Sequence, residues 1–321
     1  MSDIKIFVSH RIDIDSELIN NSLYVPVKCG AVFANNIPSN MVGDNTGDNI
    51  SERRMSFCEF TVQYWAWKNV QADYYGLCHY RRYLYFSGER HHADERNMIH
   101  VPYISERVIK DFRLDDSKII QETVKQYDVL MLAASDISKE PTPQGNKDNI
   151  WDHWVGRDNE LIYARDLEIL FKLIEELYPE YFESAKVYFK QRYHIGFNCF
   201  VMKACLFDEM CKFQFDILFE FEKYVDMSSY RGFLERTPGY MGEILYGIYI
   251  YHLQQTGKYK IKEIPVVYFE ETRKIEKNLC GQVFRLKSSI VFFIKKYFTY
   301  IFPKGTKRRE VVKKIVQPFR R

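Results

Sequence analysis

Several short motifs that mark common nucleotide and hydrolase sites are missing from the sequence. It contains no G-x-G-x-x-G, no G-x-x-x-x-G-K-[ST] and no G-x-S-x-G pattern, so neither a glycine-rich phosphate loop nor a nucleophile elbow is predicted. Its seven cysteines form no C-x-x-C pair, and its eight histidines form no H-E-x-x-H. The spacing of a zinc site is therefore absent. With no secretory signal at its start, the sequence predicts a reduced, cytoplasmic protein.

The charge balance is uneven along the chain. The formal net charge of the 321 residues is +3, but twelve Lys or Arg and a single acid stand between residues 285 and 321. The remaining body is acidic, so the basic segment predicts contact with an anionic partner, either lipid headgroups or nucleic acid. Apolar residues make up 46% of the chain and aromatic residues 16%, which is enough for one large domain with a substantial core.

Apolar runs alternate with helical patterns along the body of the chain. Residues 4–9, 74–78 and 128–134 are predicted to be buried strands, and residues 195–210 a strand that turns directly into a helix. Long loops rich in Gly, Pro, Asn and Asp connect these elements. Their order predicts an α/β fold with a mostly parallel central sheet. In such sheets, ligands bind outside the carboxyl ends of the strands.

A single helix is predicted from Ser51 to Asn69, because its apolar residues recur at helical spacing. Glu59 falls on or beside the apolar face of this helix. A buried carboxylate needs a cation or hydrogen bonds, since burying an unpaired charge is strongly unfavourable. The natural partners are the basic residues of segment 79–82, if the helix packs beside that segment. The alternative is an exposed glutamate at the edge of the apolar stripe.

The segment GLCHYRRYLYF places basic side chains directly behind a predicted strand and among aromatic residues. His79, Arg81 and Arg82 are these side chains. Two adjacent arginines at a strand end can clamp a diphosphate, because a guanidinium group matches phosphate oxygens and stays charged at physiological pH. In extended backbone the two arginines point to opposite sides, so one can face a ligand while the other pairs with an acid such as Glu59. Structural salt bridges for both arginines are the alternative.

Two later segments add polar residues of the same kind. His194 directly precedes the strand predicted within residues 195–210, Asn198 lies in its first part, and Arg236 precedes a Pro-Gly turn. Glu243 stands at the head of the helix predicted for residues 240–255. A carboxylate at the rim of a pocket is the group with which a transferase can deprotonate an acceptor hydroxyl. An ordinary acidic residue at a helix start is the equally open alternative.

An Asp-x-Asp stands directly after the first predicted strand. Asp13 and Asp15 are of the kind that can hold a divalent ion together with a nucleotide sugar. Their position argues against this role, and the spacing is common by chance. The sequence therefore predicts no metal ligand and leaves a Mn²⁺ or Mg²⁺ cofactor open.

The last segment begins with SSIVFFIKKYFTYIF, residues 288–302. It is too short and too charged to cross a bilayer, which takes about 20 apolar residues. It predicts an amphipathic helix in a membrane interface, with its aromatic residues buried and its lysines among anionic headgroups. An ordinary helix that closes the core is the alternative. Nucleic-acid binding is not predicted, because no recognised module accompanies the charge.

The chain is accordingly divided into a body, residues 1–284, and a basic amphipathic tail, residues 285–321. Membrane contact is expected through residues 288–321. Four segments of the body together resemble a family of bacterial glycosyltransferases encoded in capsular and exopolysaccharide loci, long filed as a domain of unknown function. They are GDNISERRMSFCEFTVQYWAWKN, DYYGLCHYRRYLYF, GFNCFVMKACLFDEMCKFQFDILFEFEK and RTPGYMGEILYGIYI. The specific part is W-x-W-K-N followed by G-L-x-H-Y-R-R-Y.

The resemblance implies a GT-A-like nucleotide-sugar-binding fold. It also implies a UDP-hexose donor, with galactofuranose or galactose as the first guess, and a lipid-linked oligosaccharide acceptor on the inner face of the cell membrane. The family motif falls on Glu59, Trp65, Trp67, Lys68, Asn69, His79, Tyr80, Arg81, Arg82, Asn198 and Glu243. Where the GT-A fold normally shows an Asp-x-Asp at a strand end, this sequence has HYRRY. A cationic pair can replace the ion in stabilising the leaving diphosphate.

These arguments assign expected roles to the candidate residues. Arg81 and Arg82 are expected to hold the donor diphosphate, and Glu243 is expected to be the general base if the reaction inverts the anomeric centre. The expected substrate contacts are His79, Tyr80, Glu59, Trp65, Lys68, Asn69, His194, Asn198 and Arg236. The competing hypothesis is a non-catalytic, membrane-docked subunit of a polysaccharide assembly complex that only binds the sugar nucleotide.

Overall fold

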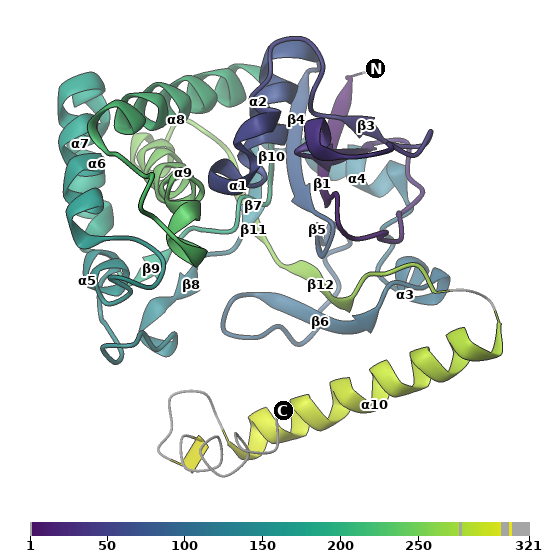
Figure 1. The fold of residues 1–321 in the computed structure, drawn as a ribbon. Helices are drawn as coiled ribbons and strands as arrows, with labels where there is room; N and C mark the ends of the chain where they lie inside the picture. Colours follow the sequence, from purple (N-terminus) through teal and green to yellow (C-terminus); the bar gives the residue numbers. More distant parts are fainter. Residues whose placement is uncertain (1, 276–277, 303–307, 310–321) are drawn as a thin grey trace.

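The apolar runs of the body assemble into one large sheet (Figure 1). The computed structural model describes residues 2–275, 278–302 and 308–309. Within them, ten strands form the sheet, with the main order β11-β7-β10-β4-β1-β2-β3. These strands are β1 (Ile4–Arg11), β2 (Tyr24–Cys29), β3 (Val42–Gly43), β4 (Tyr74–His79), β5 (Arg82–Leu84), β6 (Met98–Tyr103), β7 (Val129–Leu132), β10 (Phe200–Lys203), β11 (Ile261–Ile264) and β12 (Val266–Glu271). A separate pair is formed by β8 (Ser135–Asp136) and β9 (Tyr193–His194).

Most neighbouring strands of the main path are parallel. β1 runs parallel to β2 and β4, and β7 runs parallel to β11. β10 is reversed and pairs antiparallel with both β4 and β7, with Phe200 opposite Leu77. The predicted α/β fold with a mostly parallel sheet is confirmed. Because β10 is reversed, the residues that precede it meet the carboxyl end of β4.

Alternation along the strands divides the core between the two faces of the sheet. In β4, Tyr75 and Leu77 join one hydrophobic cluster, while Tyr74 and Cys78 join the other. Figure 1 shows α6 to α9 on one side of the sheet and α4 on the other. The helices are η1 (Ala31–Phe33), η2 (Ser51–Arg53), α1 (Arg54–Phe57), α2 (Phe60–Asn69), α3 (Glu106–Asp111), α4 (Ser117–Val124), η3 (Ile137–Lys139), α5 (Ile150–Val155), α6 (Ala164–Leu177), α7 (Pro179–Phe189), α8 (Ala204–Tyr224), η4 (Gly232–Arg236), α9 (Thr237–Thr256) and α10 (Leu279–Ile301).

The single helix predicted over residues 51–69 is wrong in one respect, because it is broken at Cys58. This residue has φ 52° and ψ −130°, outside the helical region, so η2 and α1 end before it and α2 starts after Glu59. Met55, which the spacing places on the apolar face, is 60% exposed. The break takes Glu59 out of the helical stripe and places it at the start of α2.

The helix predicted for residues 240–255 starts earlier than expected. α9 begins at Thr237, so Pro238 and Gly239 lie in its first turn and not in a preceding loop. Proline is tolerated there because the first amides of a helix have no partner inside the helix. Glu243 consequently lies beyond the first turn, where the favourable field of the helix end has largely decayed.

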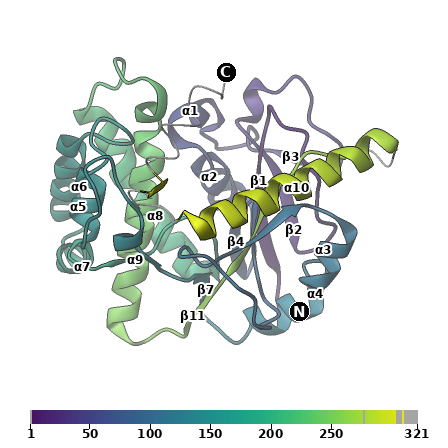
Figure 2. The same cartoon turned by 90° about the horizontal axis from the view of Figure 1, so that it is seen from below.

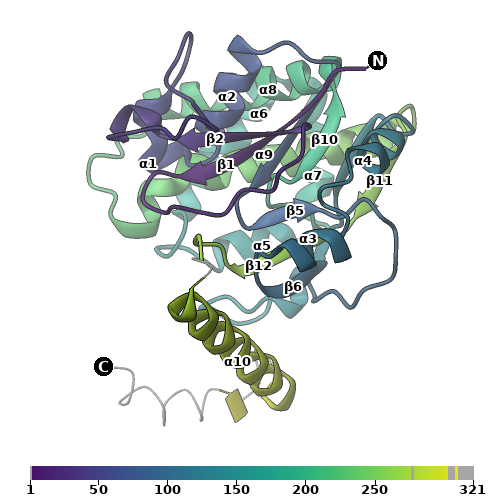
Figure 3. The same ribbon diagram turned by 90° about the vertical axis from the view of Figure 1, so that its right-hand side faces the viewer.

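α10 runs along the outside of the body. It packs beside β6, below the sheet in Figure 1, and crosses in front of the strands when the molecule is viewed from below (Figure 2). Figure 3 shows the same helix standing apart from the main body. It begins at Leu279, before the predicted boundary between body and tail at residue 285. Among the described residues, no helix has the length and apolar character that crossing a membrane requires. Most of the predicted basic end, residues 303–321, lies outside the described residues.

Candidate functional site

The candidate site lies where the carboxyl ends of β1, β2 and β4 meet. These three strands are parallel, so His10, Cys29 and His79 end at the same edge of the sheet. The reversed β10 adds the segment before Phe200 to this edge. α9 approaches from the side and carries Glu243. The residues predicted from distant parts of the sequence are thus brought to one edge, as the general rule for open α/β sheets predicts.

The basic segment after β4 forms a tight turn. His79 pairs with Arg82 across the start of β5, and Tyr80 and Arg81 occupy the turn between them. The extended backbone expected for the two arginines is therefore wrong for Arg81. Their side chains nevertheless diverge, since the Arg82 guanidinium lies 4.7 Å from the centre of the Phe197 ring and that of Arg81 lies 5.4 Å from the centre of the Tyr80 ring.

Both arginines keep hydrogen-bonding capacity that the protein does not use. The Nε atoms of Arg81 and Arg82 are buried and have no hydrogen-bond partner among the described residues. Buried polar atoms in folded proteins are nearly always paired. A group of phosphate oxygens would satisfy such donors, and guanidinium groups are suited to bind them in a fixed geometry.

His79 lies between these cations. Burial lowers the pKa of its imidazole well below the usual value, and the charges of Arg82 and Arg81 lower it further. The ring is therefore neutral at physiological pH. Its Nδ1 atom is also buried without a partner among the described residues. A neutral imidazole at a strand end can donate a hydrogen bond to a ligand hydroxyl or accept one from it.

Both polar atoms of the Asn198 side chain are buried without a hydrogen-bond partner among the described residues. The residue is 2% exposed. Its φ of 41° and that of Phe197, 66°, both lie in the left-handed region. Two successive non-glycine residues in this region are unfavourable, and such strain collects at ligand sites. The Oδ1 and Nδ2 atoms of Asn198 can therefore form hydrogen bonds with two hydroxyl groups of a bound sugar.

Two glycines bring α9 against the break between α1 and α2. A Cβ atom at Gly242 would lie 2.4 Å from Cζ of Phe60, and one at Gly239 would lie 3.2 Å from the carbonyl oxygen of Ser56. Only glycine permits this approach. This approach brings Glu243 on α9 near enough to Glu59 for the charge of Glu59 to act on it.

The charge of Glu59 acts on Glu243. Burial and the negative charge of Glu59 together raise the pKa of Glu243 to about 7, while the cations Arg82 and Arg236 act in the opposite direction. The backbone N–H of Phe197 donates a hydrogen bond to the same carboxylate. Glu243 therefore titrates near neutral pH, which is the range in which a carboxyl group can both accept and return a proton.

Arg236 connects the start of α9 to the same break. Its Nε donates a hydrogen bond to the sulfur of Cys58 over 3.0 Å, and its guanidinium lies 5.5 Å from the centre of the Tyr240 ring. Burial raises the pKa of the Cys58 thiol to about 11, with the charge of Glu59 as the next cause. The thiol is therefore protonated and serves as a neutral acceptor beside Glu59.

Other predicted contacts lie away from the two carboxylates. Trp65 is buried and donates its indole N–H to Thr46. Lys68 is exposed, with its ammonium 3.3 Å from the Trp67 ring, and Asn69 fastens the end of α2 to the carbonyl of Asp48. These contacts stabilise α2 and the loop before it. A role of Trp65, Lys68 and Asn69 in substrate binding stays a prediction.

His194 and Tyr80 belong to the packing around the site. His194 is buried on β9, where the hydroxyl of Tyr188 lies 2.7 Å from its Nδ1, and burial lowers its pKa to about 3. Gly196 allows the chain to pass this imidazole closely on the way to Asn198. Tyr80 is buried between His79 and His10. Both residues hold their neighbours in place, and their contact with a substrate stays a prediction.

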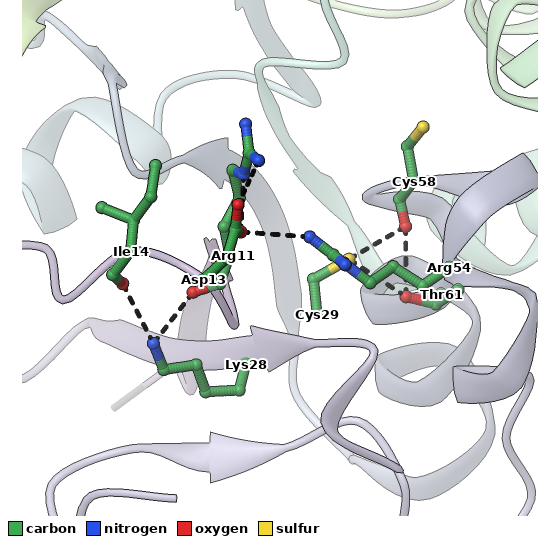
Figure 4. A network of polar contacts seen from close by, with 8 residues as sticks. All are labelled: Arg11, Asp13, Ile14, Lys28, Cys29, Arg54, Cys58 and Thr61. Carbon is green, nitrogen blue, oxygen red and sulfur yellow. Dashed lines mark hydrogen bonds and ion pairs between the residues drawn. The ribbon is translucent and has the colours of Figure 1, made fainter. Parts of the chain in front are cut away.

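Each aspartate of the Asp-x-Asp pairs with a cation. Asp13 accepts hydrogen bonds from Arg11 and Arg54 (Figure 4), and the bond from Arg11 lowers its pKa. Asp15 forms an ion pair with Lys274 at 3.0 Å. Within the described residues, no group of three or more His, Cys, Asp or Glu side chains is arranged to hold a metal ion.

The sequence did not point to two cations and an aromatic ring at this edge. Lys28 ends β2 with its side chain buried, and its ammonium donates to the carbonyls of Arg11 and Ile14 (Figure 4). The side chain of Arg54 packs against Gly30, and Figure 4 shows its contact with Asp13. The Arg82 guanidinium lies over the ring of Phe197. The available signal was the basic residue at the end of YVPVKC, which becomes visible once Tyr24–Cys29 is known to be a strand.

Comparisons with known proteins bear on the family and the fold of the chain. Residues 5–255 match the family model described as a domain of unknown function, DUF4422. The chain is similar to the apo structure of WbbM, a bifunctional glycosyltransferase, with 32% sequence identity and a TM-score of 0.77. The match covers 84% of this chain and 46% of that one, so the chain spans about half the length of the larger protein. No curated protein matches the chain. The mixed sheet and this likeness fit a GT-A-like fold.

Proposed function

Because the chain belongs to the family of the DUF4422 domain, whose function the family description leaves open, we propose from its site that it is a nucleotide-sugar-dependent glycosyltransferase. The observation that carries the proposal is the presence of Glu243, which titrates near neutrality, at the same sheet edge as polar atoms of Arg82, His79 and Asn198 that have no partner among the described residues. One group can move a proton, and the others can bind phosphate and hydroxyl oxygens. The likeness to WbbM supports the same reaction class.

In the proposed reaction, Arg81 and Arg82 hold the donor diphosphate. Their positive charge stabilises the negative charge that develops on the leaving group as the sugar is transferred. His79 and Asn198 hydrogen-bond the sugar hydroxyls. Glu243, in its ionised form, accepts the proton of the acceptor hydroxyl as that oxygen attacks the anomeric carbon. This role of Glu243 belongs to an inverting reaction.

The finer features of the proposal concern the substrates and the place of action. The donor is a UDP-hexose, with galactofuranose or galactose as the first choice, and the acceptor is a lipid-linked oligosaccharide of a bacterial surface polysaccharide such as a capsule. The enzyme works on the inner face of the cell membrane as a peripheral protein. Arg11, Lys28 and Arg54 surround Asp13 at the ends of β1 and β2 and supply further positive charge for the nucleotide end of the donor.

The test is a melting and hydrolysis screen of the purified chain against UDP-, GDP-, dTDP- and CMP-sugars, each with EDTA or with Mn²⁺. We expect a rise in melting temperature with UDP-sugars that survives EDTA, together with slow donor hydrolysis. Arg82→Gln should abolish the rise, while Arg107→Gln, at an exposed arginine on α3, should leave it unchanged.

The same screen separates the competing functions. A rise in melting temperature without any hydrolysis or transfer to added acceptors supports the non-catalytic sugar-nucleotide-binding subunit. Stabilisation only in Mn²⁺ contradicts a diphosphate held by arginines alone and directs attention to carboxylates such as Asp13 and Asp15. No response to any donor contradicts both functions.

A further inference from the structure

The outermost helix of the described chain exposes its apolar side. One face of α10 carries large apolar side chains that are each at least 50% exposed. They are Leu279, Val283, Leu286, Ile290, Phe293, Ile294, Tyr297 and Ile301. The alternating steps of three and four residues keep them on one side of the helix over its whole length. They form a continuous apolar stripe.

The opposite face of α10, which is turned to the body, carries small, polar and aromatic residues. Gly281 is buried, and Phe284, Ser288, Ser289 and Phe292 are half-buried. The Arg285 guanidinium lies 6.0 Å from the centre of the Tyr103 ring, and Lys295 pairs with Glu270 at 3.9 Å. A surface helix normally turns its apolar stripe to the core and its polar side to water. α10 departs from this arrangement, because most of its large apolar side chains are exposed on the outer face, so the stripe requires a partner outside the body.

The charges of α10 decide which partner fits. Its charged residues are Arg285, Lys287, Lys295 and Lys296, and the helix contains no acid. A second copy of the chain paired along the stripe would bring basic residues together with no carboxylate on either helix to offset them. An anionic lipid surface offers an apolar interior for the stripe and negative headgroups for the exposed Lys287 and for Lys295, whose side chain is 67% exposed.

We propose that α10 is the membrane-binding element of the protein and lies in the interface of an anionic bilayer with the stripe buried. The binding element therefore starts at Leu279, ahead of the segment 288–321 that the sequence indicates. Its significance for catalysis rests on the proposed function, but the binding itself does not depend on a donor or an acceptor.

The attachment of α10 places the bilayer near the candidate site. Lys295 on α10 pairs with Glu270 on β12. The adjacent residue of the same strand, Phe269, donates its amide hydrogen to the carbonyl of Arg81 over 2.9 Å. One strand thus connects the membrane-binding helix to the turn that carries the proposed diphosphate ligand. An acceptor anchored in the bilayer would reach the site from this side.

The test is sedimentation of the full chain with vesicles. Phosphatidylcholine vesicles are compared with vesicles of phosphatidylcholine and phosphatidylglycerol in equal parts. We expect binding only to the anionic vesicles. A variant with Ile290→Ser, Phe293→Ser and Ile294→Ser should lose binding by more than about tenfold, because each side chain contributes to burial in the lipid. The control variant carries Leu177→Ser and Val187→Ser, at exposed apolar residues on α6 and α7, and should bind as the original chain does.

Two further measurements keep the result decisive. The melting temperature and the UDP-induced rise, measured without vesicles, should be unchanged in the α10 variant, so a failure of donor binding would count against the proposed function and not against this inference. Equal sedimentation of the α10 variant and the control would overturn the inference. A dimer in light scattering that the three serines dissociate, with no lipid binding, would also overturn it and identify a second copy as the partner.

Discussion

Arg236 donates a hydrogen bond to the sulfur of Cys58 over 3.0 Å. This bond joins the first residue before α9 to the break between α1 and α2. It also leaves a positive charge near Glu243, where it stabilises the ionised form of that carboxyl group. The break, the guanidinium and the two carboxylates therefore form one structural unit.

Replacement of Glu243 by Gln should remove the proposed base and leave the donor ligands in place. We expect transfer to an acceptor to fall by about 100-fold or more, the range typical of a lost general base. The melting-temperature rise with UDP should stay close to that of the original chain. The measurement is initial transfer rate beside thermal shift. Glu175→Gln, at an exposed glutamate on α6, is the matched control. Near-normal turnover of Glu243→Gln would show that the assignment is wrong.

Replacement of Glu59 by Gln should lower the pKa of Glu243, because the negative charge of Glu59 raises it. The acid limb of the pH–rate profile should then move to lower pH. Stability should change as well. The pKa of Glu243 is higher in the folded state than in the unfolded chain, so the folded state binds more protons. The free energy of unfolding therefore falls as pH rises from the pKa of the unfolded chain through about 7. Glu59→Gln should reduce this loss. Urea denaturation at pH 5 and pH 8 measures it, and an unchanged pH dependence would contradict the coupling.

Replacement of Arg236 by Gln should act in the opposite direction. The charge of Arg236 lowers the pKa of Glu243, so its removal should move the acid limb of the profile to higher pH. A shift in the same direction as that of Glu59→Gln would be inconsistent with the electrostatic account. Arg236→Lys retains the charge without the planar Nε donor, and it should restore the profile more than it restores stability.

Replacement of Gly242 by Ala should separate α9 from α2. The added Cβ would lie 2.4 Å from Cζ of Phe60, so the contact must open, at a cost of about 1–3 kcal/mol in the free energy of unfolding. Activity should fall because Glu243 moves away from Glu59. Phe60→Leu in the same chain should recover part of both losses by making room. Denaturant unfolding and transfer assays measure the two effects, and an Ala variant with unchanged stability would show that the contact is looser than described.

The sequence was informative where a signal is local. Residues 4–9 and 74–78 are continuous apolar runs, and both are central strands. Pro179, which favours a helix start, stands at the first residue of α7. β2 was not predicted, because YVPVKC contains a proline and a lysine whose burial becomes favourable only beside β1.

Features set by tertiary contact could not be predicted in this way. The segment around Cys58 contains neither Gly nor Pro, so its sequence does not predict a helix break. The break is imposed by the docking of α9 and by the hydrogen bond from Arg236. The sequence of β10 likewise does not predict that this strand runs antiparallel to its neighbours. For the same reason, Glu59 was expected to face the basic turn, and its proximity to Glu243 emerged only from the structure.

The close contact made possible by Gly239 and Gly242 also determines when the protein can act. Glu59 arrives early in the chain and Glu243 late, and they meet only after α9 has docked on α2. A nascent or partly folded chain can collect the arginines at the end of β4, but it lacks the environment that brings Glu243 to titrate near neutrality. Under the proposed function, the general base therefore acquires its environment only once α9 has docked on α2.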